Sequence, residues 1–191
     1  LVAGVRGAWW LTPQNKVEAL SHKQAVSRLA SSPLPIVCHT PATARRLDVA
    51  PFPARDILEL FAFVRPAQFC LPTPRGIASA LDLPLPKTPD DETRVLASAT
   101  QLLLEELSLT DPHSAGDILS LAKIMDECGW PWGGIVCQIF KDTIVKRSGP
   151  PQQALEVWRR LKEWGEYAPD PPDGQEAVTP EEATSRLESL L

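Results

Sequence analysis

The sequence predicts an α/β protein: a small sheet flanked by helices, followed by a helix-rich C-terminal half. Two observations support this prediction. The N-terminal third has the order strand, strand, helix, buried strand, helix, which is typical of α/β folds. From Thr88 onward, by contrast, apolar residues recur at helical spacing in segments that begin with proline. The 191 residues suffice for one domain with a proper core, but not for two large ones.

The first elements follow from apolar runs and their boundaries. Residues 1–11 and 16–20 predict two strands joined by a turn. Ser21 is a typical N-cap for the helix that follows it. Residues 35–39, with the sequence PIVCH, are apolar and partly β-branched, as expected of a buried parallel strand. Thr40 and Pro41 then predict the start of a short helix that ends at Leu47.

The stretch from Asp56 to Leu83 is the most apolar and most heavily punctuated part of the chain. Asp56 is the expected cap of a helix that is apolar nearly all round, and that helix should end at Arg65, before a proline. Thr73 and Pro74 predict the start of the next helix by the same cap-then-proline arrangement.

The second half predicts further helices, with starts at Thr88 and at Asp111-Pro112 and a later helix over residues 135–145. A last apolar stripe comprises Ala154, Leu155, Trp158, Leu161 and Trp164. The expected organisation is a domain over residues 1–167, a Pro- and acid-rich linker over 168–179, and over 180–191 the start of a helix leading into a following domain.

Composition limits the classes of function. The net charge of −5 gives no overall attraction for nucleic acid, so DNA binding would need a local basic patch. No apolar run has the length of a membrane span, and the first residues lack a signal-peptide pattern, so the expected location is the cytoplasm. The four cysteines (Cys38, Cys70, Cys128 and Cys137) are scattered among apolar residues. They are expected to be reduced core thiols, and an iron–sulfur site is the alternative.

Three phrases in succession, PIVCHTPATARRL, DILELFAFVRP and GIASALDL, resemble the middle of a DnaQ-type 3′–5′ exonuclease. The longer pattern is similar to the N-terminal region of DinG-type ATP-dependent DNA helicases of alphaproteobacteria, where a degenerate exonuclease-like region precedes the motor. The resemblance implies a ribonuclease H-like fold in which the first strand lies beside residues 35–39. It also implies the helicase motor of the same parent chain as a partner, with DNA as a second one.

The acids that such an exonuclease needs are missing from their expected positions. The family holds two divalent metals with a set of carboxylates, beginning on the first strand. Here the first acid in the chain is Glu18, beyond that strand. The next expected acid falls near Ala44, followed by two arginines. His113 and Asp117 are four residues apart rather than five, which favours a chance match. The chain also has no phosphate-binding P-loop sequence.

Candidate contact residues are therefore basic or aromatic. Five cations are candidates for a phosphate-facing patch: Arg45, Arg46, Arg65, Arg75 and Lys87. Trp130 and Trp132 could stack on bases or contact a partner, or they could fill a gap between two helices. His39 is either a satisfied structural histidine or a remnant of the family motif, and His22 is expected to be solvated.

These observations predict a non-catalytic, exonuclease-like accessory domain of a DNA helicase, acting in DNA or partner positioning during repair or replication. It would need no cofactor itself, and ATP and Mg²⁺ would belong to the parent motor. A divergent metal-dependent 3′–5′ exonuclease is one alternative. A protein-interaction module without a nucleic-acid role is another.

Overall fold

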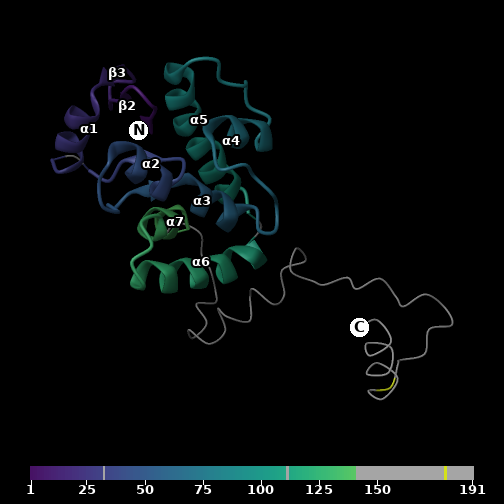
Figure 1. Ribbon diagram of the computed structural model, residues 1–191. Coiled ribbons are helices and arrows are strands. Elements are labelled where there is room, and N and C mark those ends of the chain that lie inside the picture. The colour runs from purple at the N-terminus through teal and green to yellow at the C-terminus, as the bar shows by residue number, and fades with distance from the viewer. Residues whose placement is uncertain (32, 111, 141–178, 180–191) are drawn as a thin grey trace.

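A computed structural model of the chain describes residues 1–31, 33–110, 112–140 and 179 (Figure 1). These residues form small sheets and seven helices, which confirms the predicted α/β class. The expected domain end near Tyr167, the linker over 168–179 apart from Thr179, and the helix start over 180–191 lie outside the described residues, as does the apolar stripe that includes Trp158.

The strands form two small sheets. Three antiparallel strands follow each other in the order β1 (Val2–Ala3), β2 (Ala8–Leu11) and β3 (Val17–Leu20). Two parallel strands, β4 (Ile36–Val37) and β5 (Arg55–Asp56), form the second sheet. The main-chain nitrogen of Leu1 donates a 2.8 Å hydrogen bond to Ile36 O. The beginning of β1 therefore lies next to β4.

The prediction of one strand over residues 1–11 is wrong, because the chain turns back on itself in the middle of that range. Gly4 N donates a 2.8 Å hydrogen bond to Gly7 O, and β1 and β2 pair on either side of this turn. A Cβ at Gly7 would lie 2.9 Å from Leu20 O, closer than side chains normally approach, so the glycine allows this close packing.

Four helices occupy the first part of the chain, and the predicted N-caps of three of them are confirmed. Ser21 forms a capping box with Gln24, Asp56 accepts a hydrogen bond from Leu58 N, and Thr73 accepts one from Gly76 N. The helices are α1 (His22–Leu29), α2 (Thr40–Leu47), α3 (Ile57–Val64) and α4 (Pro74–Ala80).

Three further helices are α5 (Pro89–Ser108), α6 (Pro112–Glu127) and α7 (Gly133–Ile139). The first two start where the proline signals predict. The third begins two residues before the predicted start at 135, and residues 141–145 of that prediction lie outside the described residues. Gly129, with φ of +89°, follows the end of α6 in a backbone conformation that favours glycine.

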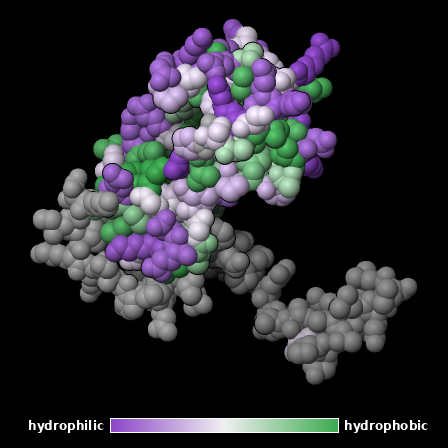
Figure 2. All heavy atoms as spheres, turned by 90° about the vertical axis from the view of Figure 1, so that its left-hand side faces the viewer, coloured by the Kyte–Doolittle hydropathy of each residue, from purple (hydrophilic) through white to green (hydrophobic). Residues whose placement is uncertain are grey.

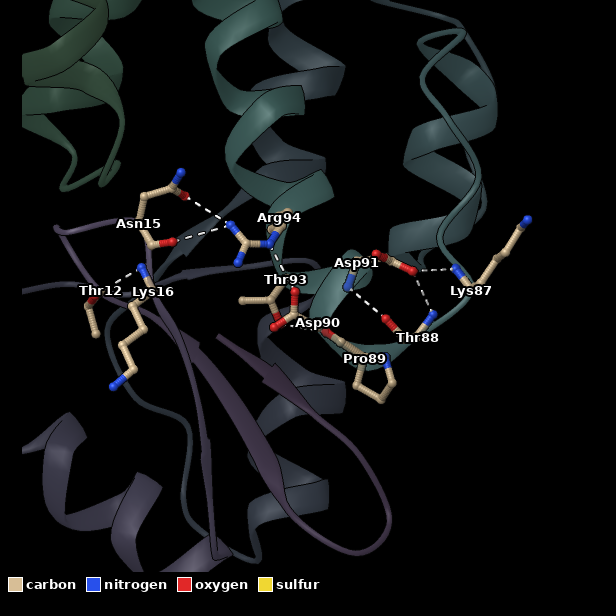
Figure 3. Close-up of polar contacts among 10 residues, drawn as sticks. All are labelled: Thr12, Asn15, Lys16, Lys87, Thr88, Pro89, Asp90, Asp91, Thr93 and Arg94. Atoms are coloured by element: carbon tan, nitrogen blue, oxygen red, sulfur yellow. Dashed lines mark hydrogen bonds and ion pairs between the residues drawn. The ribbon is translucent and has the colours of Figure 1, made fainter.

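The N-terminus of α5 is closed by a capping box (Figure 3). Thr88 Oγ1 accepts a 3.1 Å hydrogen bond from Asp91 N, and Asp91 Oδ2 accepts bonds from the main-chain nitrogens of Thr88 and Lys87. These bonds, chiefly the one with Thr88, hold the pKa of Asp91 below its ordinary value.

One turn further along α5, Arg94 connects the helix to the turn between β2 and β3 (Figure 3). Its guanidinium donates to Asn15 O at 3.2 Å and to Asn15 Oδ1 at 3.3 Å, while Asp90 pairs with its Nε at 2.9 Å. Asn15 has a positive φ of 61°, a conformation that asparagine tolerates better than most residues. Residues 79 positions apart in the sequence are thereby joined at the surface.

Most of the buried apolar side chains gather in two clusters, and Leu121 packs separately against Phe63 and Ile124. The larger one lies among α3 to α7 and includes Ile57, Leu60, Ile77, Leu96, Leu103, Trp132 and Val136. The smaller one joins the sheets to α1 and α2 and includes Ala8, Trp10, Ala25, Val37 and Leu47. In Figure 1, α6 and α7 lie at the opposite end of the molecule from α1 and β3. None of the helices in the described ranges combines the length and apolarity needed to cross a bilayer.

Candidate functional site

A small hollow lies where three segments of the chain meet. Its volume is about 70 Å³, and its walls come from β1, from the two residues that follow β4, from α2, and from the residues that begin α4. The lining residues that the argument below uses are Ala3, His39, Ala42, Thr43, Arg46 and Thr73. This is the end of the first strand, where the exonuclease resemblance expects metal-binding acids.

Asp56 connects the wall of the hollow to the neighbouring helix α3. Its side chain is buried, with Oδ2 accepting a 2.7 Å hydrogen bond from Thr40 N and Oδ1 a 3.0 Å bond from Leu58 N. One carboxylate therefore caps the starts of both α2 and α3. Because α2 contributes much of the wall of the hollow, Asp56 determines where that wall lies.

Arg46 is the charged residue of the wall. Its Nη1 donates a 2.7 Å hydrogen bond to the main-chain oxygen of Ala3, at the end of β1. A guanidinium thus occupies the place beside the first strand in which the resemblance expects carboxylates. Its positive charge opposes the binding of a second cation there.

Cys38 also lines the hollow, and its thiol is not activated as a nucleophile. Cys38 is buried, and burial, followed by the nearby Asp56 carboxylate, raises its pKa to about 12. Glu92 acts in the same direction, although neither acid lines the hollow. The thiol is therefore neutral at ordinary pH and is a poor nucleophile.

The cysteine prediction holds only in part. The four cysteines are free thiols, as expected. Cys128 is exposed, however, so its interpretation as a core thiol is wrong. Within the described residues there is no group of three or more His, Cys, Asp or Glu side chains placed to hold a metal ion.

Of the predicted cations, Arg46 lines the hollow, whereas Arg45 and Arg75 are close to its wall residues in the chain. Arg45 and Arg46 are neighbours on α2, and Arg75 directly follows Pro74 in the wall of the hollow. Arg6 lies in the turn after β1 and is also exposed. We call these four exposed arginines, Arg6, Arg45, Arg46 and Arg75, the basic rim, and Arg46 is the one of them that lines the hollow.

The other two predicted cations have structural roles elsewhere. Arg65 pairs with Glu106 at 3.0 Å and donates to Ala80 O at 3.1 Å, which joins the end of α3 to α5 and α4. Lys87 is exposed, but its main-chain nitrogen donates to Asp91 in the cap of α5. Neither residue lines the hollow.

The two tryptophans differ in exposure. Trp132 is 1% exposed and donates a 2.7 Å hydrogen bond to Asp56 O, so it fills a gap in the core as the packing interpretation predicts. Trp130 is half-buried, with its ring 4.8 Å from that of Phe63 and its Nε1 bonded to Glu59. A residue as buried as Trp132 offers no face to a base.

Larger hollows exist, and several of their charged groups are already engaged. The hollow of about 580 Å³ beside Trp10 contains Arg28, which pairs with Glu18 at 2.8 Å and lies over the Trp10 ring. A hollow of about 480 Å³ along α5 is almost entirely apolar. A third, of about 380 Å³, borders the cap of α5.

An exposed apolar loop borders the small hollow. Phe69 is 83% exposed and Leu71 is 56% exposed, just before Pro72 and Thr73 in the wall. Figure 2 shows the side of the molecule on which α1 and β3 lie, where hydrophilic side chains surround separate hydrophobic patches. Exposed aromatic and apolar side chains next to arginines suit a ligand that has both charge and flat apolar faces.

Sequence reasoning missed several of these relationships. His22, expected to be solvated, is half-buried, and its Nε2 lies 3.0 Å from Gly4 O, which joins α1 to the turn after β1. His39 is the N-cap of α2 and a half-buried wall residue, without a side-chain capping bond. In the sequence, the feature that points to Arg46 as a site residue is the pair Arg45-Arg46 on a predicted helix, together with the absence of acids from the first predicted strand.

Comparison of the chain with protein-family models, with curated proteins and with solved structures gives no match.

Proposed function

We propose that this chain is a non-catalytic, exonuclease-like domain that binds and positions single-stranded DNA for a DNA helicase motor. The observation that carries the proposal is the hydrogen bond from Arg46 to Ala3 O. It puts a cation beside the strand end at which an exonuclease of this type holds its metal ions.

A ribonuclease H-like arrangement is part of the proposal. It is supported by the Leu1–Ile36 hydrogen bond, which joins the start of β1 to β4, and by the parallel pairing of β4 with β5. The succession of β4, α2, β5 and α3 also follows the order of the phrases that resemble the exonuclease family.

The lack of catalysis is inferred from side chains. Two-metal phosphodiester cleavage requires carboxylates that hold both ions. The strand β1 and its flanking residues, Leu1 to Gly7, contain no acid. Asp56 is the buried acid among the described residues, and both of its oxygens already accept main-chain hydrogen bonds.

The association with a helicase rests on the resemblance of the sequence alone. The expected partner is an ATP- and Mg²⁺-dependent motor in the same parent protein. The test compares the DNA-stimulated ATPase rate of the wild-type parent protein with that of its Arg46→Gln variant. At limiting DNA the rate of the variant should be lower, and at saturating DNA the two rates should be equal.

Binding of a fluorescent oligothymidylate of about 12 nucleotides tests the DNA assignment. The logarithm of the binding constant should fall linearly with the logarithm of the salt concentration. No binding at low salt would overturn the assignment. Incubation of the same strand with Mg²⁺ or Mn²⁺ should leave it intact, and cleavage that Asp117→Ala abolishes would instead identify a divergent exonuclease.

A further inference from the structure

We propose that the hollow beside Arg46 is a metal-independent phosphate site, in which the guanidinium binds phosphate oxygens without a divalent ion. The ligand is one phosphate of a single-stranded nucleic acid. The inference rests on the proposed DNA-binding function and adds which residues hold the strand and by what chemistry.

The charge of Arg46 is available to a ligand. Three other arginines each have a carboxylate partner: Arg28 with Glu18, Arg65 with Glu106 and Arg94 with Asp90. In the part of the chain that the structure describes, Arg46 has no acid within ion-pair distance, and its partner is the neutral carbonyl of Ala3. That bond uses Nη1 and leaves the other guanidinium donors free, in a planar fork that matches phosphate oxygens.

The hollow has the size and the donors for one phosphate. Its volume of about 70 Å³ is room for roughly two water molecules, comparable to a small polyatomic anion. Thr73 Oγ1 accepts its capping bond from Gly76 N, so its hydroxyl proton can still be donated to a ligand. The hydroxyl of Thr43 already donates to His39 O at 3.0 Å and serves to hold the wall.

The surroundings suit a strand rather than a free anion. The remaining rim arginines, Arg6, Arg45 and Arg75, are exposed and lie within three residues of a wall residue in the chain, where a flexible strand can present further phosphates. Phe69, 83% exposed, provides a face for stacking of an unpaired base. A compact anion would occupy the hollow alone and would not contact Phe69.

The first test compares Arg46→Gln with Lys123→Gln, since each variant removes one positive charge. Arg46→Gln should weaken oligothymidylate binding at least tenfold and reduce the salt slope by about 0.7, the value for one phosphate contact on a single strand. Arg46→Lys should recover part of the affinity. Lys123→Gln, an exposed position on α6 at the far end of the molecule, should change affinity less than twofold.

A second pair of variants keeps the test decisive if Arg46→Gln unfolds. Ala42 is a half-buried wall residue on α2. Ala42→Glu brings a negative charge to the hollow and should weaken binding at least tenfold, whereas Ala42→Gln, of nearly the same size, should weaken it much less. Equal weakening by both would indicate a steric effect and would overturn the phosphate assignment.

Metal dependence and a competitor complete the design. Binding of the wild-type chain should be the same in EDTA and in Mg²⁺. Loss of binding in EDTA, or displacement of the DNA by polyglutamate at the same concentration of negative charge, would overturn the metal-independent phosphate site and leave the proposed function in place. Failure of the wild-type chain to bind any single strand would overturn the proposed function itself.

Discussion

The indole Nε1 of Trp132 donates a 2.7 Å hydrogen bond to the main-chain oxygen of Asp56, 76 positions earlier in the chain. The bond joins the start of α7 to the junction of β5 and α3. The side chain of Asp56 in turn caps α2 at Thr40. The helical end of the molecule and the wall of the hollow are therefore connected through one residue.

Trp132→Phe should destabilise the protein. The substitution keeps most of the buried apolar contact but leaves Asp56 O without its donor, at a cost of about 1–3 kcal/mol in the free energy of unfolding. Urea denaturation measures the change. Trp130→Phe is the matched control, because its bond to Glu59 is exposed and its loss should cost less. Equal effects would contradict the role assigned to the Trp132–Asp56 bond.

Asp56→Asn should lower the free energy of unfolding by about 1–3 kcal/mol. The amide of asparagine accepts hydrogen bonds at its oxygen only, so either Thr40 N–H or Leu58 N–H would be left unpaired. Thermal and urea denaturation give the value. Asp48→Asn is the control: Asp48 is exposed and has a φ of 57° at the end of α2, where asparagine fits well. A comparable loss in Asp48→Asn would show that general charge, and not the double cap, is responsible.

Glu59→Gln should make the protein more stable at about pH 7. Partial burial and the Asp56 carboxylate raise the pKa of Glu59, against the opposing hydrogen bond from Trp130. Because the pKa of Glu59 is higher in the folded chain than in the unfolded one, the carboxyl group stabilises the fold fully at pH values below the unfolded-state pKa, near 4.5. This stabilisation is lost as the pH rises through the folded-state pKa.

Glutamine keeps an acceptor for Trp130 and does not ionise. The advantage of Glu59→Gln over the wild-type chain should therefore be present near neutral pH and disappear in acid. Urea midpoints over a series of pH values provide the measurement. An advantage that is the same at every pH would show that ionisation of Glu59 is not its cause.

Asp91→Asn should have the opposite pH dependence. The hydrogen bonds around the cap of α5, led by the one with Thr88, lower the pKa of Asp91. Such a group contributes stability that is present above the unfolded value, near 3.8, and is lost as the pH falls through the lower folded value. The variant should melt at a lower temperature than the wild-type chain at neutral pH.

The difference in melting temperature between Asp91→Asn and the wild-type chain should shrink in acid, where Asp91 is protonated as well. Thr88→Ala is the companion variant, because it removes the other half of the capping box and should cost about 1 kcal/mol. Thr88→Ser keeps the hydroxyl and should cost less. A difference that persists unchanged in strong acid would contradict the assigned pKa direction.

Much of the fold could be predicted because its signals are local. Ser21, Asp56, Thr73 and Thr88 each accept a capping bond from a main-chain nitrogen two or three residues ahead, and the helix starts follow from these caps. The turn between β1 and β2 was not predicted, and the close approach of Gly7 to Leu20 O, a contact between different strands, is not visible in the sequence.

The site was less accessible to sequence reasoning for the same reason. The list of arginines included Arg46, but its bond to Ala3 spans 43 positions, and no pattern distinguishes it from Arg65, which has a carboxylate partner in α5. Likewise, Trp130 and Trp132 flank one proline and have similar contexts in sequence. Only the packing of α7 against Asp56 shows that one is core and the other is half-buried.

The bond between Arg46 and Ala3 also constrains how this chain could evolve or be engineered. A carboxylate introduced at the end of β1 would meet a guanidinium before it met a metal ion, and the two would neutralise each other. A single substitution at the strand would therefore yield an internal ion pair, and not a nuclease. An acidic, metal-binding site at this place would therefore require the strand and the helix to change together.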